Sequence, residues 1–137
     1  MLPLRYSRRW QIASLVILCL VLAAALMPAI WFWDDKVKAL LVFRGVDKWL
    51  HGVTFLALSV WFCGLYPRGS YWRIGIGLLA FGLMIEACQR MLSYRSAEWF
   101  DVAADGAGII VGLVIGIAGL GGWCLRVEEY LAGHHSD

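Results

Sequence analysis

Nearly all the unusual polar side chains of this apolar chain, those that could do chemistry, lie in three short stretches, residues 47–51, 86–90 and 95–105. Each stretch holds at least one carboxylate, and the first also holds a histidine, the side chain whose unperturbed pKa lies nearest to neutral pH. Carboxylates accept hydrogen bonds from cationic or hydroxylated ligands, and both residue types act as general acids and bases. The chain therefore carries the residue types of a binding or catalytic site, provided that the fold brings the three stretches together.

Within these stretches the spacing puts polar groups on shared helix faces, because residues three or four positions apart are neighbours on a helix. Three pairs follow this rule: Asp47 with His51, Glu86 with Gln89, and Asp101 with Asp105. The expected cationic partners of the carboxylates are Lys48, Arg90 and Arg95. The sequence thus predicts a layer of paired charges at the helix ends.

The composition shows what must position this layer. Hydrophobic residues make up 61% of the 137-residue chain and charged residues 16%, whereas a soluble domain has ~45–50% and ~25%. Four apolar runs approach or exceed the ~20 residues that a transmembrane helix needs. They are Ile12–Trp33, Trp49–Tyr66, Ile74–Leu92 and Val102–Leu125. We therefore expect an all-α fold, a bundle of four transmembrane helices, and neither a soluble enzyme nor a disordered chain.

Residues 1–137 are expected to form a single membrane domain that ends in a polar tail at 126–137. The first run is longer than the ~7–15 apolar residues of a signal peptide, so we expect it to remain as an uncleaved span, although Ala23–Ala25 could mimic a cleavage site. The short apolar patch at 40–43 is expected at the membrane interface. A net charge of +2 favours no polyanionic partner, and nucleic acid is not expected.

Four spans place both termini on one side of the membrane. Lysines and arginines number six on each side of the predicted topology, but three arginines precede the first run, at positions 5, 8 and 9. Because the first helix usually dominates the positive-inside rule, we expect both termini in the cytoplasm. The three polar stretches would then meet at the extracytoplasmic face.

An ionisable side chain near the middle of a span costs roughly 2.5–3.5 kcal/mol on insertion scales, so the polar layer is expected to have a role. Three interpretations remain open: a site that binds or processes a ligand, a salt-bridge network that only joins helix ends, and passage of ions or protons. The residues chemically suited to a metal ion are His51, Glu86, Asp101 and Asp105. Because no local ligand motif organises them, we expect no metal ion and no cofactor.

Small residues recur at four-residue spacing in the fourth run, at Gly108, Gly112 and Gly116. This pattern allows close helix packing in lipid, either within one chain or in a homodimer through the same stripe. The four cysteines, Cys19, Cys63, Cys88 and Cys124, lack CxxC spacing and are expected to behave as small hydrophobic residues.

Taken together, the order and spacing of these motifs resemble the VanZ-like family over residues 47–116. The resemblance rests on Asp47-Lys48-x-x-His51, Glu86-x-x-Gln89, Arg95-x-x-Glu98-x-x-Asp101 and Gly108-x-x-x-Gly112. The family often has asparagine where this chain has Asp105. The resemblance implies a multi-pass protein of the bacterial cytoplasmic (inner) membrane with a role in the cell envelope, and the family's named member is associated with low-level teicoplanin resistance. It also implies a functional set: Asp47, Lys48, His51, Glu86, Gln89, Arg95, Glu98 and Asp101.

The function predicted from these residues is recognition of an envelope component from the outer face. The ligand would be a membrane lipid headgroup, a lipid-linked precursor or a lipophilic glycopeptide. Asp47, Glu86 and Asp101 would supply negative charge, and Lys48 and Arg95 would bind anionic groups. The alternative is a small membrane hydrolase or transferase acting on a lipid-linked substrate. In that case His51 is the general acid or base and, together with Asp47 or Glu86, orients and activates a nucleophile such as water. No serine or cysteine nucleophile motif is present, which argues against an acyl-enzyme route.

Overall fold

The computed structural model describes the backbone of residues 1–27, 36–91 and 99–133, and the side chains of residues 1–27, 48–91 and 99–133. Within these ranges the chain is helical and contains no strand. The elements are α1 (Ser7–Leu26), α2 (Lys36–Leu65), a 3-10 turn η2 (Arg68–Ser70), α3 (Tyr71–Arg90), α4 (Trp99–Ile115), a π-helical turn η3 (Gly116–Leu120) and α5 (Trp123–Gly133). The all-α fold predicted from the sequence is confirmed.

Four segments are long and apolar enough to cross a membrane, which indicates a multi-pass membrane protein. They are Ser7–Leu26, Lys48–Leu65, Arg68–Arg90 and Trp99–Leu120. The first span begins earlier and ends earlier than its apolar run predicts. Met27 is extended, with φ −70° and ψ 133°, as expected for a residue that precedes a proline. The backbone of the apolar patch at 40–43 belongs to α2, and its side chains lie outside the described residues.

Glycines on α4 allow this helix to pack directly on the backbone of α2. A Cβ atom at Gly108 would collide with the carbonyl group of Gly52, and one at Gly112 would lie 2.5 Å from Cβ of Ser59. Gly116 likewise leaves room for the buried thiol of Cys63. The glycine stripe thus serves helix packing within one chain, and a homodimer through the same stripe would have to displace α2.

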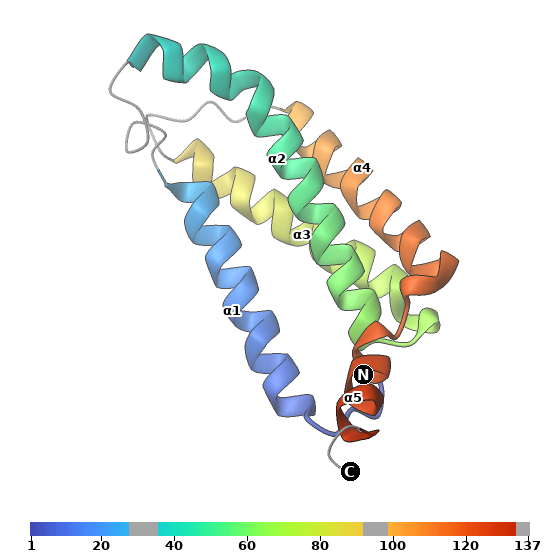
Figure 1. The fold of residues 1–137 in the computed structure, drawn as a ribbon. Helices are drawn as coiled ribbons and strands as arrows, with labels where there is room; N and C mark the ends of the chain where they lie inside the picture. Colours follow the sequence, from blue (N-terminus) through green and yellow to red (C-terminus); the bar gives the residue numbers. More distant parts are fainter. Residues whose placement is uncertain (28–35, 92–98, 134–137) are drawn as a thin grey trace.

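Helix α1 lies at the edge of the bundle that α2, α3 and α4 form (Figure 1), and Ser14 is its only buried residue. Its N-terminal end is held by α5, because the Glu128 carboxylate accepts hydrogen bonds from the backbone N–H groups of Arg5 (2.6 Å) and Tyr6 (3.0 Å) and from the Trp10 indole (2.8 Å). These bonds satisfy donors that precede or open the helix and that have no partner within it.

Three tryptophan rings pack together beside this carboxylate. The ring centroids of Trp10, Trp61 and Trp123 are 5.6 to 5.7 Å apart, within the range of favourable aromatic pairs. The Trp61 indole N–H donates to Oγ of Ser14 at 2.9 Å, and the Trp123 indole N–H donates to the Val60 carbonyl at 3.2 Å. The cluster joins α1, α2 and α5, which explains a tryptophan deep inside the second apolar run.

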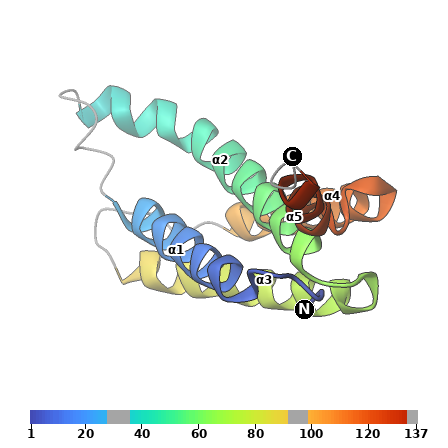
Figure 2. The same ribbon diagram turned by 60° about the horizontal axis from the view of Figure 1, so that its bottom comes forward.

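The C-terminal segment differs from the predicted polar tail at 126–137, because α5 occupies Trp123–Gly133. Gly122, with φ +70°, turns the chain ahead of α5, and its N–H donates to the Cys63 carbonyl at 2.9 Å. α5 and the N-terminus consequently lie at the same end of the bundle, as Figure 2 shows. The apolar pattern of the sequence did not predict α5, because the position of this helix depends on the backbone conformation of Gly122 and on the hydrogen bonds of the buried Glu128.

Substitution of Gly108 tests the close contact between α2 and α4. Gly108→Ala is expected to lower the melting temperature of the purified protein, since overpacking costs about 1–3 kcal/mol. Gly106→Ala, on the same helix but with no atom within 4 Å of the added Cβ, is the matched control and should not lower it. Circular dichroism in detergent measures both. Equal melting temperatures for Gly108→Ala and Gly106→Ala would contradict the packing described.

Acidification tests the Glu128 contacts. Burial opposes ionisation of Glu128, but hydrogen bonds from Trp10, Tyr6 and Arg5 and the Arg5 charge outweigh it and lower its pKa. The stabilisation is therefore present above the unfolded-state pKa of about 4.3 and is lost as the pH falls through the folded-state pKa. The melting temperature should fall less on acidification in Glu128→Gln than in the wild type. Glu129→Gln, an exposed neighbour, should behave as the wild type.

Candidate functional site

Five of the predicted site residues are buried near one end of the bundle, the end opposite to α5. They come from three helices: His51 from α2, Glu86 and Gln89 from α3, and Asp101 and Asp105 from α4. By the 1.5 Å rise of a helix, Glu86 lies about 6 Å from the end of α3 and Asp105 about 9 Å from the start of α4. We call these five residues the polar cluster. It forms a shallow layer, as the sequence predicts.

The shortest contact in the polar cluster joins His51 to Asp105. Nδ1 of His51 lies 2.9 Å from Oδ1 of Asp105, and the two side chains are 8% and 3% exposed. With Asp105 ionised, the carboxylate only accepts hydrogen bonds, and Nδ1 of His51 is then the donor in this pair. Of the two carboxylates expected to act with His51, Glu86 makes no hydrogen bond to it, and the side chain of Asp47 lies outside the described residues.

Two residues outside the predicted set shape the space around this pair. A Cβ atom at Gly82 would lie 2.5 Å from Oδ2 of Asp105, so a glycine is needed for α4 to bring its carboxylate against α3. Phe55, one turn below His51 and 1% exposed, packs near Phe81 with a centroid distance of 6.2 Å. These rings form an apolar floor below the polar cluster. The four-residue spacing of Phe55 from His51 was a signal for it in the sequence.

Glu86 is the most unusual member of the polar cluster. Its side chain is 5% exposed, and neither carboxylate oxygen has a hydrogen-bond partner among the described residues. Among the described side chains, the nearest cation is the half-exposed Arg90 guanidinium, 3.9 Å from Oε1, which is too long for a hydrogen bond. The carboxylate also interacts electrostatically with Asp101, His51 and Asp105. A buried carboxylate with neighbouring carboxylates is costly, and such a group calls for an explanation.

Gln89 contributes to the position of α1. Its Nε2 donates a hydrogen bond to the Ala25 carbonyl at 3.0 Å, in the last turn of α1. The side chain is 1% exposed. This hydrogen bond gives Gln89 a structural role in addition to its predicted role in ligand binding. Through it, the polar cluster is linked directly to the C-terminal end of α1.

Two cations flank the polar cluster at the start of α4. Nζ of Lys48 lies 4.8 Å from the centroid of the Phe100 ring, and Cζ of Arg90 lies 5.2 Å from that of Trp99. Both distances are within the range of cation–π attraction. Both rings are largely exposed. We call Lys48, Arg90 and the two rings the rim, which places positive charge outside the buried carboxylates.

Three predicted site residues cannot be placed in this geometry. The side chain of Asp47 lies outside the described residues, and so do Arg95 and Glu98. In the parts of the chain with described side chains, no group of three or more histidine, cysteine, aspartate or glutamate side chains is arranged to hold a metal ion. The polar cluster is thus a set of hydrogen-bonding and charged groups, with three carboxylates inside and two cations at its rim.

Comparison with known proteins adds no relative to this picture. No family model matches the chain, and no curated protein and no solved structure is similar to it. The likeness to the VanZ-like family therefore remains a prediction from the motifs, and the function has to be argued from the polar cluster and its surroundings.

Proposed function

We propose that this protein is a bacterial envelope protein of the cytoplasmic membrane that recognises a lipid headgroup, either of a membrane lipid or of a lipid-linked precursor. The observation that carries the proposal is the Glu86 carboxylate, whose two buried oxygens lack hydrogen-bond donors among the described residues. An ammonium or hydroxyl group of a ligand would supply these donors. The VanZ-like motifs lead to the same class of role, and a lipophilic glycopeptide such as teicoplanin is the other ligand that they suggest.

The charges around Glu86 suit a headgroup that carries both a cationic or hydroxyl group and a phosphate. The inner carboxylates of Glu86, Asp101 and Asp105 favour a cationic or hydroxylated portion, while Lys48 and Arg90 at the rim favour a phosphate. Arginine binds phosphate in two-pronged geometry and lysine binds it as a point charge. A headgroup that carries both an amine and a phosphate, as phosphatidylethanolamine does, supplies both of these charges.

A groove beside the polar cluster offers a place for the hydrocarbon tail. It lies between α1 and α2 and has a volume of about 330 Å³. Its lining begins at Val53 and Thr54, close to His51 along α2, and extends to Trp61. An apolar groove within the spans that starts next to a polar site suits a ligand with a polar head and a hydrocarbon tail.

The proposal includes the orientation of the protein in the membrane. The end of the bundle formed by the N-terminus and α5 is the arginine-rich end, which the positive-inside rule assigns to the cytoplasm. The polar cluster would then face the exterior, where envelope precursors and glycopeptides are encountered. Headgroup recognition from the outer leaflet follows from this orientation.

A second candidate function, hydrolysis or group transfer on a lipid-linked substrate, is favoured by one contact. A carboxylate that holds Nδ1 of a histidine fixes the ring for proton transfer, and Asp105 holds His51 in this way at 2.9 Å. His51 would then remove a proton from water or from another hydroxyl nucleophile. The purely structural interpretation, a network of charges that joins helix ends, needs neither a ligand nor a reaction.

Replacement of Glu86 tests headgroup recognition. We expect phosphatidylethanolamine to raise the melting temperature of the purified wild-type protein and to raise that of Glu86→Gln much less, because the amide keeps the shape but loses the charge. About a tenfold loss of affinity is expected. Glu129→Gln, an exposed acid at the other end, is the control. An equal effect on both variants would contradict the proposal, as would a Glu86→Gln protein that fails to fold while lipid has no effect on the wild type.

Replacement of His51 separates the two candidate functions. If the protein is a hydrolase, it should release phosphate from a polyprenyl diphosphate, and His51→Gln should lower the rate at least 100-fold, the usual range for a general base. Recognition alone predicts no release by the wild type and lipid stabilisation in His51→Gln within a few-fold of normal. Absence of turnover together with intact lipid stabilisation in His51→Gln would end the hydrolase hypothesis.

A further inference from the structure

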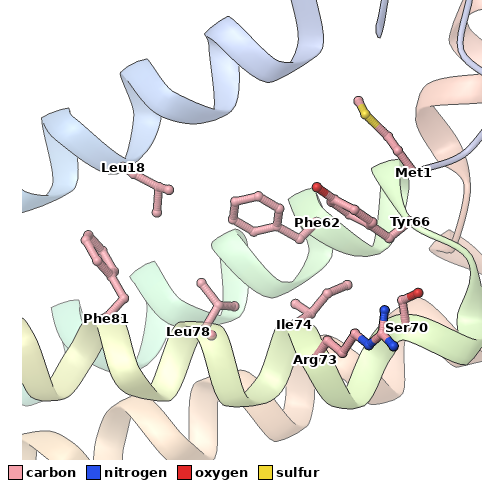
Figure 3. Close-up of a pocket in the computed structure, with 10 residues that line it drawn as sticks. Met1, Leu18, Phe62, Tyr66, Ser70, Arg73, Ile74, Leu78 and Phe81 are labelled. Atoms are coloured by element: carbon pink, nitrogen blue, oxygen red, sulfur yellow. The ribbon is translucent and has the colours of Figure 1, made fainter.

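A second groove lies on the other side of α1, between α1, α2 and α3, with a volume of about 520 Å³. Figure 3 shows its walls: Leu18 from α1, Phe62 and Tyr66 from α2, and Ile74, Leu78 and Phe81 from α3. We call it the α1–α3 groove. It lies within three of the spans, so the surrounding medium that can fill it is lipid.

One end of the α1–α3 groove is polar and the other is apolar. Arg73 and Ser70 lie at the end near the N-terminus, whereas Leu18 and Phe81 lie at the far end (Figure 3). From Arg73 to Phe81 the groove follows α3 for eight residues, or about 12 Å at 1.5 Å per residue. A cation at the mouth of an apolar channel of this length matches a phospholipid, with the phosphate at the mouth and an acyl chain inside.

The net charge at the end of the bundle that holds the N-terminus and α5 favours one class of phospholipid. The described residues there include six arginines and two glutamates, and one of the glutamates, Glu128, accepts hydrogen bonds from the α1 end. The arginines are Arg5, Arg8, Arg9, Arg68, Arg73 and Arg126. Each basic residue near a membrane surface favours anionic lipid by about 1 kcal/mol. The surplus of positive charge therefore favours a lipid with a net negative headgroup.

We propose that the α1–α3 groove is a binding site for an anionic phospholipid, with Arg73 and Ser70 on the phosphate and one acyl chain between Phe62, Ile74, Leu78 and Phe81. Guanidinium binds phosphate through two parallel hydrogen bonds, and the serine hydroxyl adds a donor. The bound lipid fills the space between α1 and the rest of the bundle. The site is separate from the polar cluster, since Arg73 and Glu86 are 13 residues apart on α3, or about 20 Å.

The experiment compares retention of two lipids with the same acyl chains, phosphatidylglycerol and phosphatidylcholine. The full-length protein, purified in detergent, is titrated with each lipid, and bound lipid is counted by native mass spectrometry. The wild type should retain phosphatidylglycerol more tightly. Arg73→Gln should weaken this binding about tenfold, whereas Arg9→Gln, an exposed arginine at the same end that does not line the groove, should weaken it less than twofold.

Filling the groove tests the acyl chain. Gly77 lines the groove, and a Cβ atom added there meets no atom within 4 Å, so Gly77→Leu should fold, and its side chain should weaken binding of both lipids. Gly106→Leu, with equally open space on α4, is the matched control. The proposal is overturned if Arg73→Gln and Arg9→Gln weaken binding equally, or if Gly77→Leu retains phosphatidylglycerol as the wild type does. Glu86→Gln should leave this binding unchanged, so the two lipid sites are tested independently.

Discussion

The direct contact between the backbones of α2 and α4 is the constraint on which the rest of the structure depends. Gly108 faces the Gly52 carbonyl without an intervening side chain, and each of these two glycines lies within one helical turn of a member of the His51–Asp105 pair. His51 precedes Gly52, and Asp105 lies one turn before Gly108. The distance between the helix axes therefore decides whether Nδ1 and Oδ1 meet at 2.9 Å. With a larger residue at Gly108, the helices would be forced apart and the histidine would lose its contact with Asp105.

Much of this architecture could be predicted from the sequence because the bilayer leaves few alternatives. The length of each apolar run predicts a membrane-spanning helix. In a chain of four spans, the end of the third and the start of the fourth lie at the same membrane face, so the burial of Glu86 and Asp101 together follows from the topology. The glycine spacing on α4 likewise predicts a close helix contact. The position of Asp105 does not follow in this way. Its pairing with His51 depends on the rotation of each helix about its axis and on the absence of a Cβ atom at Gly82. No repeating pattern in the sequence indicates either of them.

The two ends of the bundle use charge in opposite ways. At the α5 end the buried carboxylate of Glu128 has three donors and joins segments of the same chain. At the other end Glu86 is also buried, yet its oxygens receive no hydrogen bond from the described residues. The same side chain is thus structural in one place and open to chemistry in the other. The amino-acid composition cannot distinguish Glu128 from Glu86, because the two differ only in which N–H groups the fold places near the carboxylate.

The hydrogen bonds of Glu128 also have a consequence for the order of assembly. They join the backbone ahead of α1 to a side chain of α5 that lies 123 and 122 residues further along the chain, so the N-terminal end of α1 is fastened by a helix that is synthesised after α2, α3 and α4. Until α5 has been synthesised, the donors at this end of α1 lack the Glu128 carboxylate. The packed unit of α2, α3 and α4 can form in this interval. The N-terminal end of α1 is therefore secured later than its C-terminal end, which can already accept the hydrogen bond of Gln89 from α3.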